Sequence, residues 1–155
     1  MKNNNLFDLT MLHGYKKMKS ELGKPDLRIW EYLNYKADFE LAFVFSKLFW
    51  PDFMQVDGCI LLVEQYDPKS FEMWKQKFNG DCKKIESIIN HIHIYDLFLN
   101  CETEGFDITL LENLGQILLK CWGCALRELF PDKQFHFQYS TEPEEYGPTI
   151  SFYHE

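Results

Sequence analysis

The chain has 155 residues, of which 46% are hydrophobic and 17% aromatic, and it carries a formal net charge of −8. This length suits a single domain over residues 1–155 with one hydrophobic core. The acidic balance argues against nucleic acid and anionic membranes as partners, because both are bound mainly through clustered Lys and Arg.

The N-terminal segment is expected to begin without structure and to continue as a helix. We expect residues 1–5 to be disordered and a short helix to cover 6–22, with Gly23 and Pro25 ending it. The most apolar stretch, residues 41–50, is far short of the roughly 20 residues that span a bilayer. No membrane partner is therefore expected.

A long helix is predicted from Asp26, a favourable N-cap, to about Phe49. Apolar residues recur along it at spacings of three and four, so this stripe should face the core. Further phenylalanines widen the apolar surface, so the helix should be covered on more than one side. The stripe consists of Trp30, Leu33, Ala37, Leu41, Val44 and Leu48, and the additional rings are Phe39, Phe43 and Phe45.

The segment GCILLVEQY, residues 58–66, allows two interpretations. An apolar run between turn residues is typical of a strand that is buried on both faces, in which case it would be central in its sheet. Alternatively, Asp57 and Gly58 form a type I′ turn, and residues 53–56 pair with 59–62 in a hairpin.

Two further helical segments follow before the last long helix. A short helix is predicted around residues 71–78, and Asp81 can cap a longer one. The last long helix is predicted from Asp107 to Phe130. The apolar side of the helix after Asp81 consists of Ile85, Ile88, Ile89, Ile92 and Tyr95, and that of the last helix of Leu111, Leu114, Leu118, Cys121, Ala125 and Leu129.

The C-terminal end changes to a period of two. Residues 135–140, FHFQYS, and 149–154, TISFYH, alternate apolar and polar side chains, which predicts two antiparallel strands. The predicted fold is α+β, with about three main helices packed on one side of an antiparallel sheet of at least three strands.

Cys121 and Cys124 form a C-x-x-C pair among five cysteines. The odd number and the apolar or helical surroundings favour reduced thiols in a cytoplasmic protein. Redox pairs of this kind sit at helix N-termini, whereas roughly thirteen helical residues precede Cys121. A zinc site would need two further ligands, and the sequence has no second pair. We expect both thiols to be reduced, metal-free and shielded on the buried stripe.

The segment NHIHIYDLF, residues 90–98, contains the best catalytic candidates. On a helix, His93 and Asp96 are three residues apart and can touch. Asp96 would project into the apolar stripe, where a carboxylate needs a partner. The pair could act as an oriented general base, but a structural hydrogen bond explains it as well.

The predicted C-terminal strands offer a polar face for a partner. Residues 101–155 carry ten acidic and three basic side chains, so this region would attract a partner with a basic surface. The residues proposed to bind it are His136, Gln138 and Tyr153 on the strands and Glu142, Glu144 and Glu145 in the loop between them.

Two functions are compatible with these patterns. The sequence lacks the glycine-rich, Walker, H-E-x-x-H and EF-hand motifs, so we expect no cofactor and no metal. The favoured interpretation is a non-catalytic interaction protein, similar in size, charge and fold class to small bacterial immunity or inhibitor proteins, which neutralise a toxin by covering it. The alternative is a small ligand-binding domain or enzyme with a pocket at His93 and Asp96.

Overall fold

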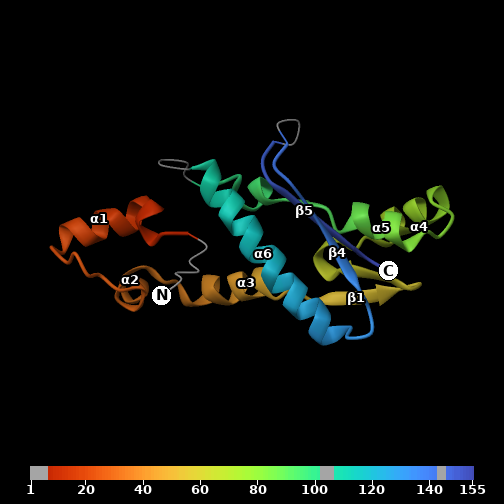
Figure 1. The fold of residues 1–155 in the computed structure, drawn as a ribbon, viewed down its shortest axis with the longest axis horizontal. Coiled ribbons are helices and arrows are strands. Elements are labelled where there is room, and N and C mark those ends of the chain that lie inside the picture. The colour runs from red at the N-terminus through yellow and green to blue at the C-terminus, as the bar shows by residue number, and fades with distance from the viewer. Residues whose placement is uncertain (1–6, 102–106, 143–145) are drawn as a thin grey trace.

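The computed structural model describes residues 7–101, 107–142 and 146–155 (Figure 1). The predictions made for residues 1–5, Glu144 and Glu145 lie outside these ranges. The helices are α1 His13–Glu21, α2 Ile29–Lys36, α3 Phe39–Phe49, α4 Pro68–Lys77, α5 Cys82–Ile89 and α6 Ile108–Leu129. The strands are β1 Phe53–Val56, β2 Cys59–Leu62, β3 Ile92–His93, β4 Phe135–Ser140 and β5 Thr149–His154. Short 3₁₀ turns are η1 Leu9–Met11, η2 Val63–Gln65 and η3 Ile94–Phe98.

The described strands form two antiparallel sheets, so the α+β class is confirmed. β1 pairs with β2, and β3, β5 and β4 form the second sheet in that order. The two predicted C-terminal strands pair directly, with Phe137 opposite Phe152 and Gln138 opposite Ser151. This register gives one face that is mainly apolar, with Phe137 and Phe152, and one that is mainly polar, with Gln138 and Ser151.

The first hairpin follows the alternative interpretation of the segment around Asp57 and Gly58. Both turn residues have positive φ angles, 49° and 89°, as a type I′ turn requires. Phe53 pairs with Leu62 across the hairpin. All four residues of β2 are buried, as predicted. The expected central position in a larger sheet is wrong, because among the described strands β2 is hydrogen-bonded to β1 alone.

The predicted helix from Asp26 to Phe49 is divided into α2 and α3. Ala37 has an extended backbone, and the Asp38 side chain accepts a hydrogen bond from the Leu41 amide at 2.7 Å. Asp38 therefore caps a new helix, because its carboxylate satisfies an amide that has no partner in the first turn. The expectation that Asp26 starts the helix is also wrong, since α2 begins after Arg28.

Helix α5 is shorter than the pattern of isoleucines predicts. It ends at Ile89, Asn90 is its C-cap, and Ile92 enters β3, where it pairs with Ile150 of β5. Tyr95 lies in η3. The prediction that Ile92 and Tyr95 belong to this helix is wrong, because pairing with β5 replaces the next helical turn.

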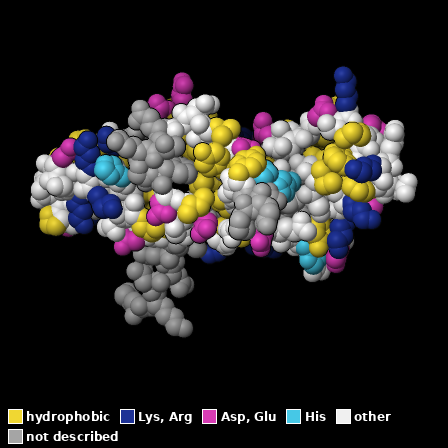
Figure 2. Space-filling model, turned by 90° about the horizontal axis from the view of Figure 1, so that it is seen from above, with side chains coloured by type: hydrophobic (Ala, Val, Ile, Leu, Met, Phe, Trp, Pro, Cys, Tyr) yellow, Lys and Arg dark blue, Asp and Glu magenta, His cyan; other side chains and the backbone are white. Residues whose placement is uncertain are grey.

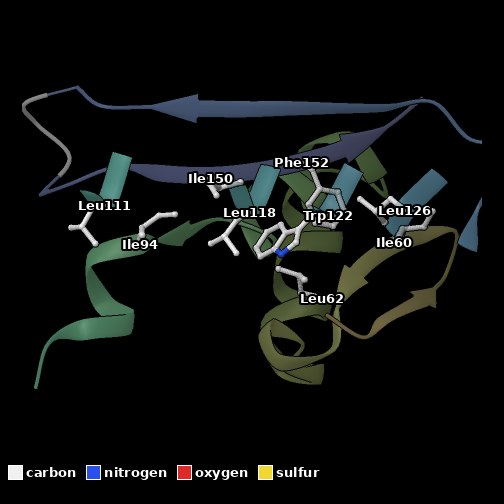
Figure 3. Packing of buried hydrophobic residues seen from close by; sticks show 9 residues of the cluster. All are labelled: Ile60, Leu62, Ile94, Leu111, Leu118, Trp122, Leu126, Ile150 and Phe152. Carbon is white, nitrogen blue, oxygen red and sulfur yellow. The ribbon is translucent and has the colours of Figure 1, made fainter. Parts of the chain in front are cut away.

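The strands lie between two groups of helices. On one side, Trp122 of α6 packs near Phe152 and Ile60 (Figure 3). On the other side, Leu61 of β2 packs with Ile85 of α5. Alternate strand residues point to opposite faces, and both sets of β2 are apolar, so helices cover both faces. The predicted arrangement, with the main helices on one side of one sheet, is therefore wrong.

The molecule is elongated (Figure 1). Helices α1 and α2 lie at one end, α4 and α5 lie at the other, and α6 crosses the middle. Tyr15, Met18 and Leu27 form a small apolar cluster of their own at the first end. Within the described ranges, no helix is long and apolar enough to cross a membrane.

Candidate functional site

The structure brings His93 and Asp96 into one cluster with Tyr146. The Tyr146 hydroxyl donates a hydrogen bond to Asp96 Oδ2 at 3.0 Å, and its ring stacks on His93 with centroids 4.3 Å apart. His91 adds a second imidazole, with Nε2 3.3 Å from Nε2 of His93. These contacts tie η3 to the segment that precedes β5.

Asp96 is exposed, so the expectation of a buried carboxylate is wrong. The expectation assumed that the helix after Asp81 continued through this position, whereas that helix ends at Ile89. In η3 the carboxylate points toward solvent and is held by a tyrosine hydroxyl. This hydrogen bond is compatible with a structural role that joins η3 to the segment before β5, and equally with a general base.

The predicted polar face on β4 and β5 is present. His136 is opposite Tyr153, and their rings stack with centroids 5.2 Å apart. Helix α5 covers part of this face, because Lys83 Nζ lies 4.5 Å from the centroid of the Tyr153 ring. Gln138 and Glu142 are exposed. The accessible part of the face is therefore narrower than the sequence predicts.

The two thiols of the C-x-x-C pair differ in environment. Cys121 is half-buried, and burial raises the pKa of its thiol. Cys124 is exposed, and its sulfur lies 3.3 Å from the Arg127 guanidinium. The prediction that both are shielded is wrong for Cys124, because a spacing of three residues turns it past the edge of the buried stripe.

The sequence did not identify a buried carboxylate, Glu86, between β2 and β5. Its Oε1 accepts a hydrogen bond from the Ile60 amide at 2.6 Å, and its Oε2 accepts one from the His154 amide at 2.7 Å. The His154 imidazole Nδ1 lies 2.6 Å from Oε1. Burial raises the pKa of Glu86, because removal from water disfavours the charged form, while these hydrogen bonds oppose the shift.

Asn90 extends the same connection one helical turn later. Its Oδ1 accepts from the Leu62 amide at 3.0 Å, and its Nδ2 donates to the carbonyls of Ile60, at 3.0 Å, and Phe152, at 3.3 Å. Glu86 and Asn90 thus satisfy backbone groups of β2 and of the part of β5 that extends beyond its pairing with β3. In the sequence, these two polar residues lie four positions apart among isoleucines. This spacing is the local signal that could have indicated their role in joining the sheets.

The largest departure from the predicted core is on α2 and α3. Phe39 is 79% exposed, Trp30 71% and Phe43 62%. The rings of Phe39 and Phe43 pack edge to face, with centroids 5.1 Å apart. The prediction that the stripe faces the core of this chain is wrong over most of its length. The exposed large apolar residues of these helices, which we call the α2–α3 apolar surface, are Ile29, Trp30, Leu33, Tyr35, Phe39, Leu41, Phe43 and Val44.

The C-terminal end of α3 is anchored to the main core. Phe45, Leu48 and Phe49 are half-buried, and Leu48 and Phe49 pack against the main core. The Trp122 indole donates a hydrogen bond to the Leu48 carbonyl at 2.9 Å. Residues 39–44, the N-terminal half of α3, are exposed, whereas its C-terminal end packs on the core.

Two surface cavities lie near the N-terminal end of the described chain. One of about 180 Å³ is lined by Phe7, Leu12 and residues of α6, and one of about 420 Å³ is lined by Phe7, Tyr15 and Ile29 among others. Neither includes His93 or Asp96. Among the described residues, no group of three His, Cys, Asp or Glu could hold a metal ion.

Comparisons with protein-family models, with curated proteins and with solved structures found no match.

Proposed function

We propose that this protein is a non-catalytic interaction module of the immunity or inhibitor type, and that it binds a partner protein through the α2–α3 apolar surface. The observation that supports this is the exposure of Trp30, Phe39 and Phe43 on consecutive helices. The rings of Phe39 and Phe43 also pack on each other, and monomeric proteins rarely expose large clusters of apolar side chains unless they form an interaction site. Aromatic residues are also the side chains most enriched at the centres of interfaces.

The composition of α3 supports the same proposal. Its sequence, FELAFVFSKLF, is apolar on most of its circumference, which is typical of a helix that is covered on several sides. Among the described residues, the packing of α3 against α6 leaves much of this circumference exposed. Burying one exposed ring contributes roughly 1.5 to 3 kcal/mol, so a partner that covers the remaining sides gains a substantial binding free energy.

The charges around the surface indicate the chemistry of the partner. Residues 26–52 carry five acidic and three basic side chains, and the whole chain carries −8. Figure 2 shows the molecule from the side opposite to α3, and on that face Lys and Arg lie mainly toward the two ends. A partner with an apolar groove bordered by Lys and Arg would complement the net negative charge of residues 26–52. A second copy of the chain is disfavoured, because two copies carry the same negative charge.

The test is photo-crosslinking in the source cell. A benzoylphenylalanine is placed at Phe43 of the full chain, and a matched control is placed at Met73 of α4, which is 53% exposed but lies at the other end of the molecule. We expect one protein to be captured from position 43 and not from position 73, through an apolar segment flanked by Lys or Arg. Equal capture from both positions, no capture from position 43, or capture of a second copy would overturn the proposal.

The acidic C-terminal region is a second docking candidate, because Gln138 and Glu142 remain exposed. With the captured partner in hand, association is measured by stopped flow for two variants. One replaces Phe39 and Phe43 by Ser, and the other replaces the acidic residues of the loop by Gln. Loss of binding only in the first variant supports the α2–α3 apolar surface. A slower on-rate only in the second would move the docking site to the C-terminal strands. The substitutions in the second variant are Glu142→Gln, Glu144→Gln and Glu145→Gln.

A further inference from the structure

Cys59 of β2 and Cys82 of α5 lie side by side where the hairpin packs against α5. Both are free thiols, and their Sγ atoms are 2.7 Å apart. A disulfide bond requires a separation of about 2.05 Å. The two sulfurs therefore need to approach by less than about 1 Å to bond. The three other cysteines belong to other segments of the chain.

The surrounding contacts hold the two thiols in place. Glu86, one turn after Cys82 on α5, binds the amide of Ile60, the residue next to Cys59. Glu86 therefore sets the position of α5 against β2. The hairpin turn also packs on the second thiol, since a Cβ added at Gly58 would lie 3.7 Å from Cys82 Sγ.

We propose that Cys59 and Cys82 form a reversible redox pair that is oxidised by small-molecule disulfides such as oxidised glutathione. This inference is independent of the proposed function, because it concerns the opposite end of the molecule from the α2–α3 apolar surface. A cytoplasm keeps such thiols reduced, and a rise in the oxidised small-molecule disulfide converts them to a cross-link.

The difference in exposure sets the order of the two steps. Cys59 is 1% exposed, whereas Cys82 is half-buried, so the external reagent reaches Cys82. The Cys82 sulfur attacks the reagent, a mixed disulfide forms, and the first glutathione leaves as a thiol that takes the Cys82 proton. Cys59 then loses its proton and attacks the Cys82 sulfur, and the second glutathione leaves as a thiol. The two protein thiols lose two electrons, and one glutathione disulfide becomes two thiols.

Burial makes the second step dependent on proximity. Removal from water raises the pKa of the Cys59 thiol, so this group is a poor nucleophile toward reagents in solution. Once the mixed disulfide forms at Cys82, the target sulfur is adjacent, and the reaction becomes intramolecular. The resulting bond joins the β1–β2 hairpin to α5 and closes the loop that contains α4.

The test uses the full chain, reduced and then incubated with oxidised glutathione under native conditions. Remaining thiols are alkylated after acid quenching, and peptides are mapped by mass spectrometry. We expect a Cys59–Cys82 cross-linked peptide, while the exposed Cys124 takes up glutathione and serves as a positive control. The proposal is overturned if Cys59 and Cys82 are still alkylated as free thiols when Cys124 has reacted.

Two variants separate the steps. Cys59→Ala should accumulate glutathione on Cys82, because nothing displaces it, whereas Cys82→Ser should leave Cys59 unmodified. Rapid modification of Cys59 in Cys82→Ser would contradict the proposed order. If Cys59→Ala does not fold, disulfide formation is tested by the urea midpoint of the wild type. This midpoint should rise on oxidation and return to its original value after reduction. Cys124→Ser, the matched control, should show the same rise.

Discussion

Glu86 connects two sheets that have no direct backbone hydrogen bonds to each other in the described strands. Replacing it by Ala leaves the Ile60 and His154 amides buried without acceptors. We expect Glu86→Ala to lower the free energy of unfolding by about 3 to 5 kcal/mol, as measured by urea denaturation. The control, Glu64→Ala, changes an exposed carboxylate and should stay within about 0.5 kcal/mol.

The raised pKa of Glu86 predicts a pH dependence of stability. The ordinary pKa of the group is 4.5, and burial raises the pKa in the folded protein. In the pH interval above the ordinary value, the folded state therefore binds more protons than the unfolded state, and stability falls as pH rises. Glu86→Gln should flatten this fall. The urea midpoint is measured across this pH interval with Glu and with Gln at position 86. Both proteins also carry His154→Gln, so that the neighbouring imidazole does not contribute to the slope. An unchanged slope would show that Glu86 is ionised over the whole interval.

Asp96 provides the contrasting case of an exposed carboxylate. Its carboxylate accepts a hydrogen bond from the Tyr146 hydroxyl at 3.0 Å, in a region open to water. We expect Asp96→Ala to cost at most about 1 kcal/mol in thermal or urea denaturation, because water replaces the lost hydrogen bond. A loss of several kcal/mol would mean that the carboxylate is buried after all.

Helix α6 packs closely against β4 at Gly115. A Cβ there would lie 2.8 Å from Cε2 of Tyr139 and 3.3 Å from Cδ1 of Ile94, so the helix or the ring must move. At Gly123, in the same helix, the nearest atom would be at an ordinary 3.4 Å. We expect Gly115→Ala to destabilise by about 1 to 3 kcal/mol. Gly123→Ala should be neutral or stabilise by up to about 1 kcal/mol through helix propensity. Equal effects in urea denaturation would contradict this packing.

Asp38 caps the start of α3, directly after the extended residue Ala37 that separates α3 from α2. Asp38→Ala removes the acceptor for the Leu41 amide and should cost about 1 kcal/mol. Asp38→Ser, which retains a capping oxygen, should restore most of that loss in the same denaturation assay. If both variants match the wild type, the cap does not determine where α3 begins.

The elongated shape leaves the α2–α3 apolar surface outside the core, and this separates its role in binding from its role in stability. Replacing Phe39 and Phe43 together by Ser should change the free energy of unfolding by less than about 1 kcal/mol, because both rings are exposed in the isolated chain. Phe71→Ala, in the core, should cost about 3 to 5 kcal/mol. A large loss in the double variant would show that these rings are buried within the chain.

Much of the fold follows from short-range patterns in the sequence. Asp81 caps α5 as predicted, α6 begins next to Asp107 as predicted, and the alternation in 135–140 and 149–154 produces β4 and β5. The turn at Asp57 is also encoded locally. These features are predictable because a cap, a turn or an alternating strand depends on residues within a few positions of one another.

The end of α5 and the environment of the candidate sites depended on the tertiary structure. Asn90 is buried by backbone groups about 30 and 60 positions away in the chain, and pairing with β5 stops the helix that would have turned Asp96 inward. The apolar stripe that predicts a core helix at α3 is equally compatible with a surface that becomes buried when a partner binds. Periodicity shows that a face avoids water, but it cannot show which chain covers that face, because burial is set by the arrangement of distant elements.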